Sequence, residues 1–389
     1  MTRNRGSCSD HSRRCVDLVA SPARNLFESQ SGNTVHSLRD AFTMPSLPFS
    51  SFRLLPIVIA AVALAGCGRQ TEPARSDAAP LAADGKPLLK VGFQLDWYPS
   101  PEHGGHFQAL VKDYYRDGGL DVTIAPGGPG SFPLPIVSTG RMDFAMGRCD
   151  DVILAVKQGL PLLIVCAQMQ HDPQAIMMHD DGPVRSFKDL DGRSVMSGPG
   201  ANWVGYVQRH YGVHFNVIPM DYGVGRFMSD KSFVQQCFIT NEPYFAELHG
   251  VKTRALLIAG GGYDPYRVIF TNRSFAAAHP DAVRAFVAAT IRGYTEYLHG
   301  DARQARAKIQ AENPSQSDPL FDYSISAMKR FQLVEGDPAK GERMGLITPE
   351  RMNALQQTLV DLKLLDAPMP LESFVSFDFL PPAQTGAAK

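Results

Sequence analysis

The stretch LPLLIVCAQMQHDPQAIMMHDD, residues 160–181, decides the fold. Its first half, 160–170, is almost wholly apolar, which is typical of a strand that is buried on both faces of a sheet. Its second half, 172–181, continues as another extended segment without a helix between the two. This interruption indicates that the chain leaves one α/β lobe here and enters another.

Strands and helices alternate on both sides of this stretch, which predicts an α/β protein whose parallel sheets are covered by helices. The segments before it are three strands, at 88–97, 120–128 and 141–147, and three helices, at 107–119, 131–140 and 150–159. The segments after it are three strands and two helices, at 215–221, 231–240, 253–260, 200–212 and 242–250. Beyond residue 274 the pattern becomes almost purely helical.

A second extended segment, Arg267 to Thr271, also breaks the alternation. Paired with 175–179, it would form a two-strand hinge between two α/β lobes. We therefore assign 88–176 and 268–389 to lobe 1 and 177–267 to lobe 2.

The N-terminal part has the pattern of an export signal. Arg53 precedes an apolar run at 54–65, which is too short to cross a bilayer of about 30 Å as a helix. The sequence LAGC at 64–67 resembles the lipobox of bacterial lipoproteins, which implies cleavage before Cys67 and a lipid anchor on its thiol. We assign 1–66 to a leader and signal peptide, with Met44 as a candidate true start. Residues 67–87 form a flexible tether; an uncleaved buried helix is the alternative to the signal peptide.

Composition narrows the class of partner. The chain has 389 residues and a formal net charge of −1, and it lacks the basic footprint of a nucleic-acid-binding protein. Cys149, Cys166 and Cys237 are widely spaced and match neither a disulfide framework nor a metal site, so each is expected to pack as a small apolar residue. We predict a small-molecule ligand, no cofactor, no metal and no nucleic acid.

Seven stretches in this order resemble the NMT1/THI5-like solute-binding proteins, relatives of thiamine-pyrimidine-precursor, alkanesulfonate and nitrate/taurine binding proteins. They are LDWYPSPEHGGHF (95–107), GLDVTIAPGGPG (119–130), TGRMDFAMG (139–147), VKQGLPLLIV (156–165), SFKDLDGRSV (186–195), TNEPYFAE (240–247) and HPDAVRAFVAAT (279–290). The resemblance covers about 90–330. It implies a type II periplasmic-binding-protein fold, which binds its ligand between two lobes and closes about a hinge.

The family also contains eukaryotic pyrimidine synthases, which consume a histidine of their own. Asp151 stands where that histidine aligns, and the segment YDPYRVIFT, 263–271, has no cysteine where the synthases have a cysteine-rich run. We therefore expect that this protein is not an enzyme.

Four candidate ligand-binding residues follow the first strand, on the side of an α/β sheet where ligands usually bind. Trp97 and Tyr98 could stack on a flat ring or could cap the core. Asp96 could accept hydrogen bonds from an amino group or could cap the loop. His103 could contact the ligand or stabilise the loop, and a metal site shared with His106 is a further alternative.

Three more candidates lie where the third strand meets its helix. Asp150 and Asp151 could stabilise the helix N-terminus, or one of them could bind the amino face of a ligand. Arg148 could neutralise these acids or hold an anion.

The second lobe supplies the last three candidates. Asn202 and Trp203 open a helix at the edge of the lobe and could face the cleft, and Glu242 stands at a strand-to-helix junction. No Ser-His-Asp or Cys-His arrangement stands out.

The leading hypothesis is a lipid-anchored, monomeric solute-binding protein of an ABC importer, located in the periplasm or at the cell surface. It would capture a thiamine-related aminopyrimidine precursor and deliver it to permease and ATPase subunits. The alternatives are a protein that binds sulfonate, nitrate or taurine through Arg148 and helix N-termini, a pyrimidine-synthase-like enzyme, and a periplasmic sensor module.

Overall fold

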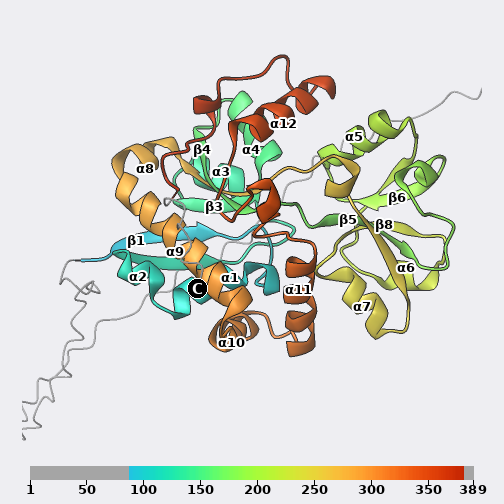
Figure 1. The fold of residues 1–389 in the computed structure, drawn as a ribbon, viewed down its shortest axis with the longest axis horizontal. Helices are drawn as coiled ribbons and strands as arrows, with labels where there is room; N and C mark the ends of the chain where they lie inside the picture. The colour runs from blue at the N-terminus through green and yellow to red at the C-terminus, as the bar shows by residue number, and fades with distance from the viewer. Residues whose placement is uncertain (1–86, 381–389) are drawn as a thin grey trace, which may run out of the picture. The chain divides into compact units, whose positions relative to one another are not determined.

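The computed structural model describes residues 87–380, which contain two five-stranded mixed sheets (Figure 1). The predicted signal peptide, the lipidation site Cys67 and most of the tether lie outside the described residues and stay predictions. None of the helices in 87–380 combines the length and apolarity that a membrane crossing requires.

The first sheet forms lobe 1. Its strands, in spatial order, are β2 (Leu120–Ala125), β1 (Leu89–Gln94), β3 (Phe144–Arg148), β10 (Arg267–Asn272) and β4 (Leu162–Met169). β1 pairs in parallel with β2 and β3, as the alternating pattern predicts. β10 pairs antiparallel with both β3 and β4, so the prediction of a purely parallel sheet is wrong. The reason is that β10 enters this sheet from the other lobe and not through a helical crossover.

The second sheet forms lobe 2. Its strands, in spatial order, are β7 (Asn216–Pro219), β6 (Ser194–Ser197), β8 (Val234–Phe238), β5 (Gln174–His179) and β9 (Thr253–Leu257). β6 is parallel to β7 and β8, whereas β5 is antiparallel to β8 and β9. β5 thus has the same place in lobe 2 that β10 has in lobe 1.

Helices cover both sheets. Those of lobe 1 are α1 (Gly104–Val111), α2 (Tyr114–Asp117), α3 (Pro133–Ser138), α4 (Cys149–Lys157), α8 (Arg273–Ala278), α9 (Pro280–His299), α10 (Arg303–Glu312), α11 (Asp318–Arg330) and α12 (Pro349–Asp361). Those of lobe 2 are α5 (Asn202–Tyr211), α6 (Gly225–Ser229) and α7 (Glu242–Leu248). Short 3-10 helices are η1 (Pro101–His103), η2 (Phe187–Leu190), η3 (Ala259–Gly261), η4 (Pro338–Lys340) and η5 (Leu371–Ser373).

The apolar pattern of 160–170 is confirmed as a buried strand. All eight residues of β4 are buried, because the strand has a partner strand on one side and helices against its faces. Cys149, Cys166 and Cys237 are unpaired and at most 1% exposed, so the prediction that they pack as small apolar residues is confirmed.

The chain crosses between the sheets twice, through 170–173 and through 258–266. The predicted pairing of 175–179 with 267–271 is wrong, because these segments are β5 and β10 and each pairs within its own sheet. The hinge therefore consists of the two crossing segments, 170–173 before β5 and 258–266 before β10.

An ionic network joins the two crossings. His171 of the first crossing contacts Asp264 of the second through Nδ1 at 2.6 Å and Glu342 through Nε2 at 3.0 Å. Arg351 of α12 donates to the Asp264 carboxylate at 2.8 Å, and the backbone N–H of Asp172 donates to its other oxygen at 3.1 Å. Asp264 is therefore the point at which both crossings and lobe 1 meet.

Candidate functional site

The polar and aromatic residues of the site come from strand ends in both lobes. Lobe 1 contributes the β1–η1 loop and the β3–α4 junction, and lobe 2 contributes the β6–α5, β7–α6 and β8–α7 connections. These connections leave the carboxyl ends of their strands, which is where α/β sheets bind ligands.

Two adjoining cavities lie between the lobes, with volumes of about 580 and 330 Å³. Their size is in the range of small-molecule sites. The residues that line both cavities are Asp96, Trp97, Gly198, Gln236 and Phe238. We call the two cavities together the interlobe cleft.

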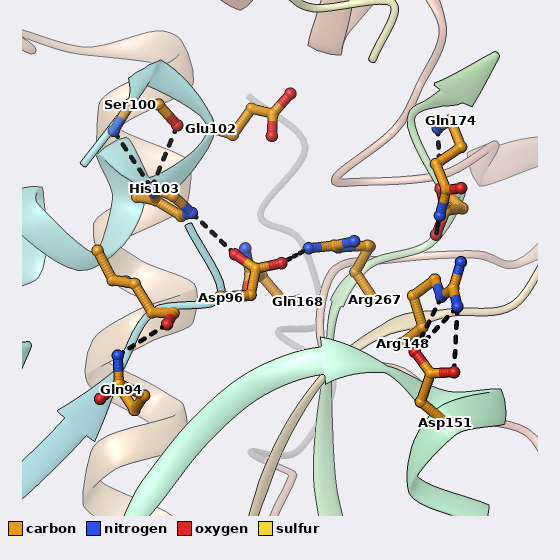
Figure 2. Close-up of polar contacts among 12 residues, drawn as sticks. Gln94, Asp96, Ser100, Glu102, His103, Arg148, Asp151, Gln168, Gln174 and Arg267 are labelled. Carbon is orange, nitrogen blue, oxygen red and sulfur yellow. Dashed lines mark hydrogen bonds and ion pairs between the residues drawn. The ribbon is translucent and has the colours of Figure 1, made fainter. Parts of the chain in front are cut away.

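Asp96 is held at the centre of the cleft by two partners (Figure 2). His103 contacts one carboxylate oxygen through Nε2 at 3.2 Å, and Arg267 of β10 forms an ion pair with the other. Burial lowers the pKa of His103 to about 3, so its ring is neutral. The backbone N–H of Ser100 donates to His103 Nδ1 at 3.2 Å, which leaves Nε2 as the protonated nitrogen that donates to Asp96. His103 is 1% exposed and lies behind Asp96, outside the cavity lining.

Arg148 is the second arginine of the cleft, and it too is paired. It donates to both oxygens of Asp151, from Nε at 3.1 Å and from a terminal nitrogen at 3.0 Å (Figure 2). Its Nε also lies 3.5 Å from Asp150. Burial acts to lower the pKa of Arg148, but the two carboxylates outweigh it and the pKa is raised above its usual range. The guanidinium is therefore charged, and the carboxylates of Asp150 and Asp151 already balance its charge.

Asp150 joins the lobes and does not line the cleft. It is 0% exposed, and its Oδ2 accepts hydrogen bonds from Asn202 of α5 at 2.8 Å and from the hydroxyl of Tyr263 at 2.6 Å. Asn202 also donates to Asp151 at 3.3 Å, and it lines a separate apolar groove beside the cleft. The acids at the start of α4 thus tie lobe 1 to lobe 2.

Three aromatic rings meet at the cleft. Trp97 lines both cavities and lies edge-on to Tyr98, with ring centroids 5.5 Å apart. Tyr222, from the lobe 2 segment after β7, packs on Trp97 with centroids 5.1 Å apart. Tyr98 and Tyr222 are each 50% exposed. The arrangement gives a flat ligand an aromatic wall with contributions from both lobes.

Trp203 is placed differently from its predicted position at the cleft. It is 1% exposed and packs in the lobe 2 core, with its ring parallel to that of Phe215. Its indole N–H lies 3.3 Å from Gln236 Oε1, and Gln236 does line the cleft. Any effect of Trp203 on a ligand would pass through this amide.

Two further carboxyl groups line the larger cavity. Glu242 opens α7, and its Oε2 accepts the backbone N–H of Phe238 at 2.7 Å. Glu102 in η1 is 9% exposed and accepts the hydroxyl of Thr240. Burial raises the pKa of Glu242, and burial together with the charge of Glu242 raises the pKa of Glu102 well above its usual range.

Six of the ten predicted ligand-binding residues therefore line the cleft: Asp96, Trp97, Tyr98, Arg148, Asp151 and Glu242. His103, Asp150 and Trp203 stand behind it, and Asn202 faces the neighbouring groove. Direct contact of any of them with a ligand stays a prediction.

Sequence reasoning missed several lining residues, among them Glu102, Tyr222, Gln236 and Arg267. Glu102 lies within the quoted stretch 95–107, so its position after a strand was an available signal. Arg267 gives no local signal, because its partner is 171 positions away in the sequence. Within 87–380 the structure contains no group of three or more His, Cys, Asp or Glu side chains arranged to hold a metal ion.

The architecture is that of the periplasmic binding proteins, as the sequence predicts. The aliphatic sulphonate binding protein SsuA of Escherichia coli superposes with a TM-score of 0.53 at 16% identity, over 74% of this chain and 91% of that one. The family described as NMT1/THI5 like matches residues 100–303, more than half of the chain. This protein belongs to that family.

Two curated relatives are binding proteins. The formylaminopyrimidine-binding protein of Halalkalibacterium halodurans is 30% identical over 146 residues, which are 37% of this chain and 41% of that protein. The riboflavin-binding protein RibY of Chloroflexus aurantiacus is 25% identical over 292 residues, 71% of this chain and 78% of that protein. These two relatives and this structural neighbour are each named as proteins that bind a small solute.

Proposed function

We propose that this protein is the solute-binding component of an ABC importer and that its ligand is a planar nitrogen heterocycle, a thiamine-related aminopyrimidine precursor. The ligand would occupy the interlobe cleft, and the closed protein would present it to permease and ATPase subunits. Anchoring through a lipid on Cys67, a monomeric state and the absence of catalysis belong to the same proposal.

The observation that carries the proposal is the combination of an aromatic wall with paired arginines. Trp97 offers a ring face in a cleft that also contains carboxyl groups. The two arginines that line the cleft, Arg148 and Arg267, are each bound to carboxylates of the protein itself. A sulfonate or nitrate would have to compete with those carboxylates, whereas a neutral or cationic heterocycle would not.

The enzyme alternative has weak support from the chain. Asp151, at the aligned position of the sacrificed histidine, is bound to Arg148 and Asn202. A carboxylate held in this way stabilises the lobe contact and cannot donate the atoms of an imidazole.

The test is calorimetric titration of the full chain with formylaminopyrimidine, riboflavin and an alkanesulfonate. We expect saturable binding of the pyrimidine and none of the sulfonate. Riboflavin is included because RibY, a relative of this protein, is a riboflavin-binding protein. Tight binding of the sulfonate alone would overturn the ligand assignment.

Substitution of Trp97 locates the site. We expect Trp97→Ala to weaken pyrimidine binding about tenfold or more, because ring stacking contributes about 1 kcal/mol beyond the buried area. Phe132→Ala is the matched control, since Phe132 is 66% exposed and does not line either cavity. Equal affinities for the two variants would place the ligand elsewhere.

A further inference from the structure

Two carboxyl groups face the larger cavity from opposite lobes. Glu102 belongs to lobe 1 and Glu242 to lobe 2, and both line the cavity of about 580 Å³. Glu102 accepts the hydroxyl of Thr240, and Glu242 accepts the backbone N–H of Phe238. Within residues 87–380 neither glutamate forms an ion pair, so the hydrogen-bonding capacity of the two carboxyl groups is only partly used.

A third acceptor in the same cavity has no partner at all. Gln316 is 8% exposed, and its amide nitrogen donates to Ser315 Oγ at 3.0 Å. Gln316 lines the cavity, and its Oε1 is buried without a hydrogen bond from any residue in the described part of the chain. Buried acceptors are rarely left without a donor in folded proteins. Gln316 is therefore a further polar residue in the lining, beside the two carboxyl groups.

Glu102 is held rigidly in this position. Its backbone carbonyl accepts the hydroxyl of Tyr294 at 2.7 Å. Two and three positions further along the chain, Gly104 and Gly105 pack so closely on α9 that a Cβ atom on either would collide with the ring of Tyr297 or Tyr294. A side chain fixed before binding loses little conformational freedom when the ligand arrives, which favours selectivity.

We propose that Glu102 selects the ligand by binding an amino group and the adjacent ring nitrogen of a heterocycle, while Glu242 accepts a further N–H from the opposite lobe. This inference rests on the proposed function and specifies which edge of the ring is recognised. The ring nitrogen and the carboxyl group of Glu102 share one proton in this contact. If the ring nitrogen carries it, the carboxylate accepts two N–H bonds; if Glu102 carries it, the carboxyl donates to the ring nitrogen and accepts from the amino group.

The raised pKa of Glu102 is compatible with either position of that proton, because a buried acid and a weakly basic ring nitrogen can share it. A ligand that lacks the amino group would leave the carboxyl group partly unpaired. Sites built to hydrogen-bond a group discriminate strongly against analogues that lack it.

The experiment compares two ligands of the same ring and similar size, 4-amino-2-methylpyrimidine and 2,4-dimethylpyrimidine, by titration calorimetry of the full chain. We expect the wild-type protein to bind the amino compound at least about tenfold more tightly, a difference of about 1.4 kcal/mol. Glu102→Met keeps the length of the side chain without its oxygens, and we expect it to reduce the preference below about threefold.

Glu102→Gln distinguishes edge recognition from simple charge attraction. A glutamine amide offers a donor beside an acceptor, which is the pattern that reads an amino group next to a ring nitrogen in adenine. We therefore expect Glu102→Gln to retain most of the preference that Glu102→Met loses. Equal loss in both variants would show that only the charge matters and would overturn the inference.

Glu247→Met is the control, because Glu247 is exposed on α7 and does not line the cavity. The thermal midpoint of each variant verifies that it is folded. Failure of the wild-type protein to bind either pyrimidine would remove both the proposed function and this inference. Binding of both compounds with equal affinity, lost in Trp97→Ala, would remove this inference and leave the proposed function standing.

Discussion

Replacement of His171 by glutamine tests the ionic network that joins the two crossings. Both ring nitrogens of His171 contact carboxylates, Nδ1 to Asp264 at 2.6 Å and Nε2 to Glu342 at 3.0 Å, so the ring donates twice when it is protonated. The hydrogen bond with Asp264 raises the pKa of His171 above its usual 6.5, although partial burial and Arg351 act in the opposite direction.

The size of the effect follows from the geometry. A hydrogen bond to a charged group contributes about 1.5–3 kcal/mol, and the His171 side chain is 19% exposed, so some solvent screening applies. We expect His171→Gln to lower the free energy of unfolding by about 2 kcal/mol at pH 5.5. For a folded part of nearly 300 residues that corresponds to a decrease of about 3 °C in Tm.

The sign of the pH dependence is fixed by the direction of the pKa shift. Because the pKa is raised on folding, the stabilisation is fully present below about 6.5 and is lost as the pH rises through the folded-state pKa. The difference in stability between wild type and His171→Gln should therefore shrink between pH 6.5 and pH 9, by at most about 1.4 kcal/mol for each pH unit.

Urea denaturation at pH 5.5, 7 and 9 measures this difference. His299→Gln is the matched control, since His299 also pairs with a carboxylate, Glu335 at 3.0 Å, but is about half exposed. A difference between wild type and His171→Gln that stays constant over this pH range would refute the role of protonation in the network.

Two further substitutions test the framework of the site. Gly105→Ala places a methyl group against the Tyr294 ring, so we expect urea denaturation to show a loss of about 1–3 kcal/mol in the free energy of unfolding. The control is Gly130→Ala, where the space is open and stability should change by less than about 0.5 kcal/mol. Equal effects of the two substitutions would contradict the close packing of Gly105. Arg267→Met removes the cation that pairs with Asp96, so we expect the free energy of unfolding to fall by about 3 kcal/mol in the same assay. An unchanged stability would mean that solvent or another group compensates the charge of Asp96.

Burial could be predicted from the sequence because it depends on local pattern. The apolar run of β4 has no polar face, so both of its faces had to be covered. Strand partners depend on distant segments, and this is why the extended segments that became β5 and β10 were paired with each other and not within separate sheets.

The site shows the same division between local and distant information. Trp97 lies three residues after the end of β1, and its position at the cleft could be predicted from that alone. Trp203 follows a strand end too, but its place near the start of α5 turns it toward the core, and the rotation of a helix about its axis is set by packing. Arg267 was missed because its role exists only once Asp96 lies beside it.

The chain contains two tryptophans, and the fold gives them opposite surroundings. Trp203 is enclosed in the lobe 2 core, while Trp97 stands at the cleft beside Tyr98 and Tyr222. Intrinsic fluorescence should therefore divide into a component from Trp203 that follows unfolding and a component from Trp97 that is quenched or shifted when the cleft fills. The protein carries its own optical readout of occupancy, and no attached dye is needed to follow it.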